Sequence, residues 1–188
     1  GGTSPDYTTF TAAVADLNNR GLCGAVTFNV RPGTYTEQVS ITQLIGSSSS
    51  NTVTFQSQNG DSSSVVLNYP TNGSFNTNYV VQLNGADYIT FRKMTLSRSG
   101  LNFYGTVVEI KNNACYNTFT NNRILGTRYQ TVSNVFSLFY SSNENDSFNT
   151  FSYNLMRNGV YGFYLSGSSS NSLEKGNKIT GNIADSIY

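Results

Sequence analysis

The chain has 188 residues, a number typical of one domain, and 11 Lys and Arg against 10 Asp and Glu give a formal net charge of +1. A charged fraction of 11% argues against a nucleic-acid partner, because phosphates are neutralised by clustered basic residues. The absence of histidine excludes a Ser-His-Asp triad and histidine-ligated zinc, and no apolar run is long enough for membrane insertion.

The first predicted element is a helix that begins near residue 10. Thr8 or Thr9 can cap it, and Gly21 can end it. Its apolar residues follow the i, i+3, i+4, i+7 spacing of one helix face: Phe10, Ala13, Val14 and Leu17. Residues 1–22 are therefore predicted to form an N-terminal cap.

From residue 26 onward the hydrophobic period changes to two, which is typical of strands. Six apolar strand centres follow one another at intervals of 27 or 28 residues: Phe28, Phe55, Leu83, Ile110, Leu138 and Leu165. A second pattern of an Asx residue, a spacer and an apolar residue recurs at Asp87, Asn117, Asn149 and Asn171. We interpret these Asx positions as turn residues that bond the backbone, rather than as metal ligands.

A period in the twenties, built from short strands without further helices, predicts an all-β fold: a right-handed parallel β-helix of about six coils with an N-terminal capping α-helix. Residues 23–188 would form it. Hairpin signals and the longer period of a propeller blade are missing. Apolar residues persist to the end of the chain at Ile183, Ile187 and Tyr188, so we expect further coils of the same chain or a stacked subunit at that end.

The two cysteines, Cys23 and Cys115, lie on opposite sides of strand centres that are three coils apart. At about 4.8 Å per coil they would be roughly 14 Å apart, which is too far for a disulfide. We expect both to be free thiols that behave as small buried hydrophobic residues.

Two resemblances accompany this pattern. The segments 6–13 and 26–39 resemble the N-terminal end of pectin methylesterases, and looser similarity extends over about the first hundred residues. This resemblance implies a pectin-lyase-like fold. The aspartates that carry that family's esterase chemistry have no counterpart here, since the corresponding segments are 105–109, 126–128 and 158–163. Fold alone does not transfer function.

The segments 34–39, 51–57 and 79–91 look like coils of large surface-exported proteins of Bacteroidota, which are often sent out by a type IX secretion system. This resemblance implies an extracellular or cell-surface location.

Outward positions of the predicted strands supply the candidate sites. Glu109 and Lys111 are the charged pair on this face and, two residues apart, should point to the same side. They could act as base and charge stabiliser in a polysaccharide lyase or an esterase-like enzyme on an acidic polysaccharide, or they could form a solvated ion pair.

A glycan-binding groove is the other candidate. Phe139 and Tyr164 would offer flat rings beside the amides of Gln82 and Asn84, with Tyr129, Tyr140 and Tyr161 nearby in sequence. Packing between coils is the structural alternative for these rings. Asp61, Glu144 and Asp146 lie in predicted loops, and the last two could contribute to a Ca²⁺ site, but too few oxygens are in view to predict one. We expect no cofactor.

These observations favour a non-catalytic, extracellular or cell-surface β-helix that serves as a rigid stalk or adhesin. Glycan or cell-surface polysaccharide binding and end-to-end self-assembly into a filament remain open. The alternative is a carbohydrate-active enzyme that uses Glu109 and Lys111.

Overall fold

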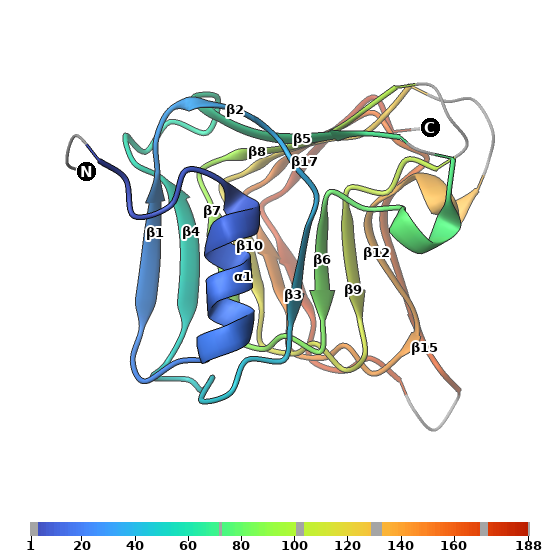
Figure 1. Ribbon diagram of the computed structural model, residues 1–188. Coiled ribbons are helices and arrows are strands. Elements are labelled where there is room, and N and C mark those ends of the chain that lie inside the picture. Colours follow the sequence, from blue (N-terminus) through green and yellow to red (C-terminus); the bar gives the residue numbers. More distant parts are fainter. Residues whose placement is uncertain (1–3, 72, 101–103, 129–132, 170–172, 188) are drawn as a thin grey trace.

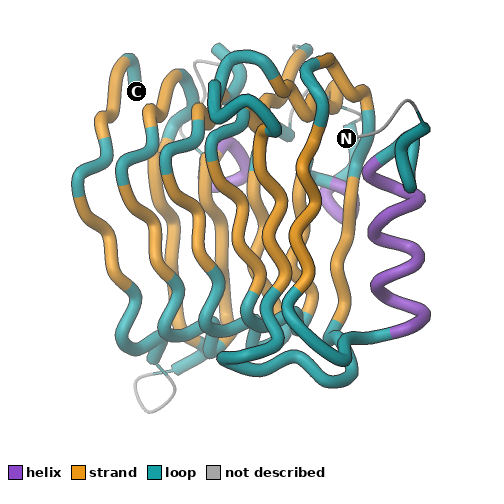
Figure 2. Tube along the Cα trace, turned by 90° about the vertical axis from the view of Figure 1, so that its left-hand side faces the viewer, coloured by secondary structure: helices purple, strands orange, loops and turns teal. Residues whose placement is uncertain are grey.

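A computed structural model describes residues 4–71, 73–100, 104–128, 133–169 and 173–187. The chain forms a parallel β-helix whose coils stack side by side, with α1 at one end of the stack and the C-terminal residues at the other (Figures 1 and 2). The predicted fold class is confirmed. The coils are slightly fewer than expected, because two sheets have six strands and the third has five.

Helix α1 (Phe10–Arg20) is the predicted capping helix. The Thr9 side chain accepts a hydrogen bond from the Ala12 N–H, and the N–H of Gly21 donates to the Leu17 carbonyl. Its buried residues are the four that the periodicity indicates: Phe10, Ala13, Val14 and Leu17. Of the helices in the described ranges, none is long and apolar enough to cross a membrane.

Glu37 fastens α1 to the first coil. Its carboxylate accepts hydrogen bonds from the N–H groups of Phe10 and Thr11, at 3.1 and 2.8 Å, and from the Thr11 hydroxyl at 2.6 Å. A negative charge at the N-terminus of a helix satisfies free N–H groups and interacts favourably with the helix dipole.

We expect Glu37→Ala to lower the free energy of unfolding by about 1 kcal/mol, because two helix N–H groups lose their acceptor. Glu37→Gln keeps an acceptor oxygen, so its free energy of unfolding should decrease less. Urea denaturation of the two variants measures the difference, and equal stability of Glu37→Ala and the parent protein would show that the contact does not hold the helix.

Three parallel sheets, which we call A, B and C, form the sides of the coil. Sheet A contains β1 (Val26–Val30), β4 (Val53–Ser57), β7 (Ile89–Arg92), β10 (Thr118–Thr120), β13 (Thr150–Ser152) and β16 (Lys178–Thr180). Sheet B contains β2 (Gly33–Thr36), β5 (Val65–Pro70), β8 (Thr95–Ser99), β11 (Arg123–Leu125), β14 (Leu155–Arg157) and β17 (Ile183–Asp185). Sheet C contains β3 (Val39–Thr42), β6 (Val81–Asn84), β9 (Val108–Lys111), β12 (Ser137–Glu144) and β15 (Tyr161–Gly167). Two short 3-10 helices, Phe75–Thr77 and Asn134–Phe136, precede β6 and β12.

The predicted column of strand centres is wrong, because it joins two sheets. Phe28 and Phe55 belong to sheet A, but Leu83 belongs to sheet C and pairs with Ile41 and Ile110. The true neighbour of Phe55 is 36 residues farther along, and its column continues through sheet A as a stack of rings whose centroids are 4.7 to 6.0 Å apart: Phe28, Phe55, Phe91, Phe119 and Phe151. From Phe55 onward these rings are at most 1% exposed and form the centre of the core.

Two ladders of asparagine side chains run along the corners on either side of sheet A. In the first, the side-chain oxygens of Asn117, Asn149 and Asn177 accept from the backbone N–H one coil earlier, and each side-chain amide donates to a carbonyl of that earlier coil or its corner. Asn122, Asn154 and Asn182 repeat this arrangement five residues later. The ladders satisfy backbone groups that would otherwise be buried without a partner.

The predicted turn role of the Asx positions is confirmed for Asn117 and Asn149, and Asp87 accepts from the Cys115 N–H. Asn171 lies outside the described residues, and Asn177 continues the first ladder.

Both cysteines are free. Contrary to the expectation of two buried thiols, Cys23 is exposed. Cys115 is half-buried, and burial raises the pKa of its thiol, which disfavours the reactive thiolate.

Candidate functional site

The outer face of sheet C carries the largest share of the predicted site residues. Alternate residues of β3, β6 and β9 point away from the core, and the registers align Ser40, Gln82 and Glu109 in one row. The Ser40 hydroxyl donates to the Gln82 side-chain oxygen at 2.6 Å, and the Gln82 amide donates to Oε2 of Glu109 at 2.5 Å. The row is therefore a fixed chain of hydrogen bonds rather than a set of independent surface groups.

Two tyrosines extend this row toward the C-terminal end. Tyr140 pairs with Glu109 in the register, and Tyr164 pairs with Tyr140. Their rings are stacked, with centroids 5.6 Å apart and planes 11° from parallel, and Tyr161 meets Tyr164 edge-on at 5.9 Å. Because β15 is the last strand of sheet C, Tyr140 covers one face of the Tyr164 ring and the other face points toward the open end.

Phe139 is not part of this face. It is fully buried, and its ring stacks on Phe163 in the core at 5.1 Å. The sequence alignment placed Leu138 opposite Ile110, whereas β12 pairs Phe139 with Val108. The observed register differs from the predicted one by three residues. An odd shift reverses which side chains of a strand point outward, so Tyr140 points outward opposite Glu109 and Phe139 points inward.

Gln82 and Asn84 do lie on the outer face. Gln82 is only 8% exposed, because it is bonded on both sides along the row. Asn84 is half-buried and accepts a hydrogen bond from the side-chain amide of Asn112. Tyr129 falls outside the described residues.

Glu109 and Lys111 are adjacent outward positions of β9, as predicted, but they do not form an ion pair. The ion pairs among the described residues are Arg20 with Asp16 and Arg157 with Asp185. Burial raises the pKa of the Glu109 carboxyl, and the negative charge of Glu144 adds to the rise. The Gln82 hydrogen bond and the positive charge of Lys111 act in the opposite direction without cancelling it.

Tyr79 also borders the row, and Arg98 holds it there. Arg98 lies in β8 of sheet B and is 2% exposed, and its guanidinium donates to the carbonyls of Tyr79, at 2.7 Å, and Thr77. Burial lowers its pKa to about 10, so it stays charged at neutral pH. Sequence patterns could not identify this role, because an arginine in a strand is usually an exposed residue.

The acidic residues considered for Ca²⁺ are already engaged within the protein. Both carboxylate oxygens of Asp146 have partners, the Ala114 N–H at 2.7 Å and the Ser141 hydroxyl at 2.7 Å. Asp61 accepts from the N–H and the hydroxyl of Ser63. Within the described ranges, no group of three or more His, Cys, Asp or Glu residues has an arrangement that could hold a metal ion.

Taken together, fold and face define a parallel β-helix with a tyrosine and amide face on sheet C. Comparison with models of protein families, with curated proteins and with solved structures finds no match to this chain. The resemblances to pectin methylesterases and to Bacteroidota surface proteins therefore gain no support from relatives.

Proposed function

We propose that the protein is a non-catalytic β-helix module at the cell surface or outside the cell that binds a glycan on the outer face of sheet C. The observation that carries the proposal is the Tyr140 and Tyr164 stack beside the hydrogen-bonded row of Ser40, Gln82 and Glu109. A sugar offers an apolar face to an aromatic ring and hydroxyls to amides and carboxylates, and this face supplies both kinds of group.

Rigidity supports the same proposal. The row lies on paired strands: β6 and β9 pair with a strand on each side, and β3 pairs with β6 and contacts α1. Binding therefore requires little ordering of the protein. The same construction supports a role as a rigid stalk or adhesin.

A carbohydrate-active enzyme is the second candidate, favoured by the raised pKa of Glu109. A carboxyl that keeps its proton closer to neutral pH suits a general acid or base, and the nearby Lys111 could stabilise negative charge on an acidic polysaccharide.

A glycan array separates the two. The array is probed with the parent protein and with the Tyr164→Ala and Glu109→Gln variants. Any glycan that binds is then analysed for reaction products. We expect binding without product, and at least a tenfold loss of affinity in Tyr164→Ala, which corresponds to about 1.4 kcal/mol. Turnover that Glu109→Gln abolishes would establish the enzyme instead, and absence of binding would contradict both.

Tyr153→Asn is the matched control. Tyr153 is 63% exposed at the corner between sheets A and B, away from sheet C, and has a φ of 55°. Asparagine tolerates that backbone conformation, so the variant removes an exposed ring without straining the corner. It should bind like the parent protein.

A further inference from the structure

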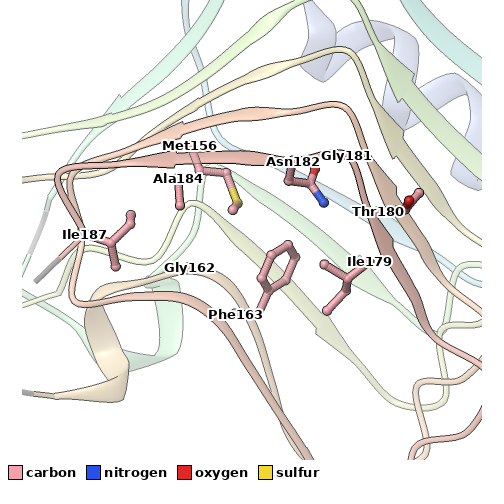
Figure 3. A pocket seen from close by; sticks show the side chains of 9 residues that line it. All are labelled: Met156, Gly162, Phe163, Ile179, Thr180, Gly181, Asn182, Ala184 and Ile187. Carbon is pink, nitrogen blue, oxygen red and sulfur yellow. The ribbon is translucent and has the colours of Figure 1, made fainter.

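The end of the stack opposite α1 is apolar and uncovered. There Met156, Phe163 and Ile179 point into one hollow of about 460 Å³ (Figure 3). Ile179 is 50% exposed and Ile183 is 64% exposed, although the equivalent residues of the previous coil, Phe151 and Leu155, are buried and half-buried. The core thus continues to this face without a covering layer among the described residues.

The two asparagine ladders stop at the same face. The N–H groups of Asn149 and Asn154 donate to the side chains of Asn177 and Asn182, at 2.8 and 2.9 Å. The N–H groups of Asn177 and Asn182 occupy the next rung, and they have no acceptor within the described part of the chain.

The carbonyl acceptors of the two ladders lie at a constant offset in the sequence. Each asparagine amide donates to the carbonyl that lies three residues before the ladder position of the coil below: Asn149 to Ala114, Asn177 to Asp146, Asn154 to Phe119 and Asn182 to Phe151. Applied to Asn177 and Asn182, the same rule designates the carbonyls of Glu174 and Ile179 as the next acceptors.

We propose that this end face binds one further parallel coil, formed by a polypeptide with the pattern Asn-x-apolar-x-x-Asn-x-apolar. Its two asparagines would accept from the N–H groups of Asn177 and Asn182 and donate to the carbonyls of Glu174 and Ile179. Its apolar residues would cover Ile179 and fill the hollow. The pattern is that of the preceding coils, where Phe119 and Phe151 follow their asparagines by two residues.

A second copy of this chain stacked end to end does not fit the pattern. The first coil carries Val26 and Gly33 at the positions of the two ladders, as the registers of β1 with β4 and of β2 with β5 show. Helix α1 also covers that end, where Phe10 packs on Phe55 and Tyr35 at 5.9 and 5.1 Å. The proposal is independent of glycan binding.

The test adds one further coil with its two asparagines to the end of the chain. The chain is extended after residue 188 by a second copy of residues 161–187. The connection between β14 and β15 has three residues, 158–160, and residues 186–188 supply a connection of the same length after β17. The first residues of the two connections also share a backbone conformation, with φ angles of 57° at Asn158 and 59° at Ser186. The control extension carries alanine in place of both copied asparagines.

Amide hydrogen exchange at the original Asn177 and Asn182 is followed by NMR. We expect exchange to slow at least tenfold in the asparagine extension and to stay within twofold of the 188-residue chain in the alanine control. No slowing in either extension, or equal slowing in both, would overturn the proposal. Slowing in the unextended chain that grows with protein concentration would assign the face to a second copy, and would also overturn it.

Discussion

Asn149→Ala is expected to lower the free energy of unfolding by about 2 to 6 kcal/mol. The Asn149 side chain is 1% exposed, accepts from the Asn117 N–H and donates to the Ala114 carbonyl, at 2.9 and 3.0 Å. Alanine leaves both backbone groups buried without partners, and each such group costs about 1 to 3 kcal/mol.

Two further variants separate this cause from a general effect of substitution. Asn149→Asp keeps the acceptor oxygen but removes the amide donor, so its decrease in the free energy of unfolding should be intermediate. Lys178→Ala changes an exposed neighbour and should stay within about 0.5 kcal/mol of the parent protein. Urea denaturation measures all three, and a loss below about 1 kcal/mol in Asn149→Ala would mean that the ladder does not hold the coils together.

The second large effect concerns pH, because the protein should become more stable between pH 7.5 and pH 5. Asp146 and Glu174 both contact the buried Ser141 hydroxyl, at 2.7 and 2.5 Å. One hydroxyl hydrogen can serve only one of two carboxylates, so the arrangement favours a protonated carboxyl at the other. Burial raises the pKa of each acid to about 6, and the charge of Glu144 contributes at Asp146.

The direction of this change in stability follows from the linkage between proton binding and folding. Since the folded-state pKa values lie above the ordinary values of 3.8 and 4.5, the folded protein binds protons that the unfolded chain has already released. The stabilisation is complete below those ordinary values and is lost as the pH rises through about 6. We expect a gain of about 1 to 2 kcal/mol from pH 7.5 to pH 5, less than two independent groups would give.

Asp146→Asn provides the matched variant, because an uncharged amide can keep the contacts with Ala114 and Ser141. Its free energy of unfolding should vary at most half as much over the same pH range. A parent protein that loses stability steadily from pH 7.5 to pH 5 would contradict the account of this acid pair.

The sequence predicts the β-helix and α1 because those features depend on local patterns. The period-two strands and the helix face of Phe10, Ala13, Val14 and Leu17 are visible without knowledge of pairing. The register is not visible, because each coil has three strands of similar spacing and corners of different length. An interval of 27 or 28 residues therefore connected Phe55 with Leu83, which lie in different sheets.

In the candidate site, too, the local strand pattern could be predicted from the sequence and the register could not. Gln82, Glu109 and Tyr164 lie outward as predicted, because their strands alternate regularly. Phe139 was placed on the wrong face because its strand is shifted by three residues, an odd number, from the predicted register. The acid pair was missed because Asp146 and Glu174 are brought together only by the stacking of coils. The asparagine pairs five residues apart were a detectable signal, since 117 and 122 recur as 149 and 154 and as 177 and 182.

A glycan site on sheet C is tested most sharply by an NMR titration with the glycan that gives the strongest array signal, observing the tyrosine ring resonances. We expect shifts for Tyr164, Tyr161 and Tyr140 that saturate together, while the ring of Tyr153 stays unchanged. Shifts at Tyr153 without shifts at Tyr164, or no saturable shift at any tyrosine, would contradict a glycan site on sheet C.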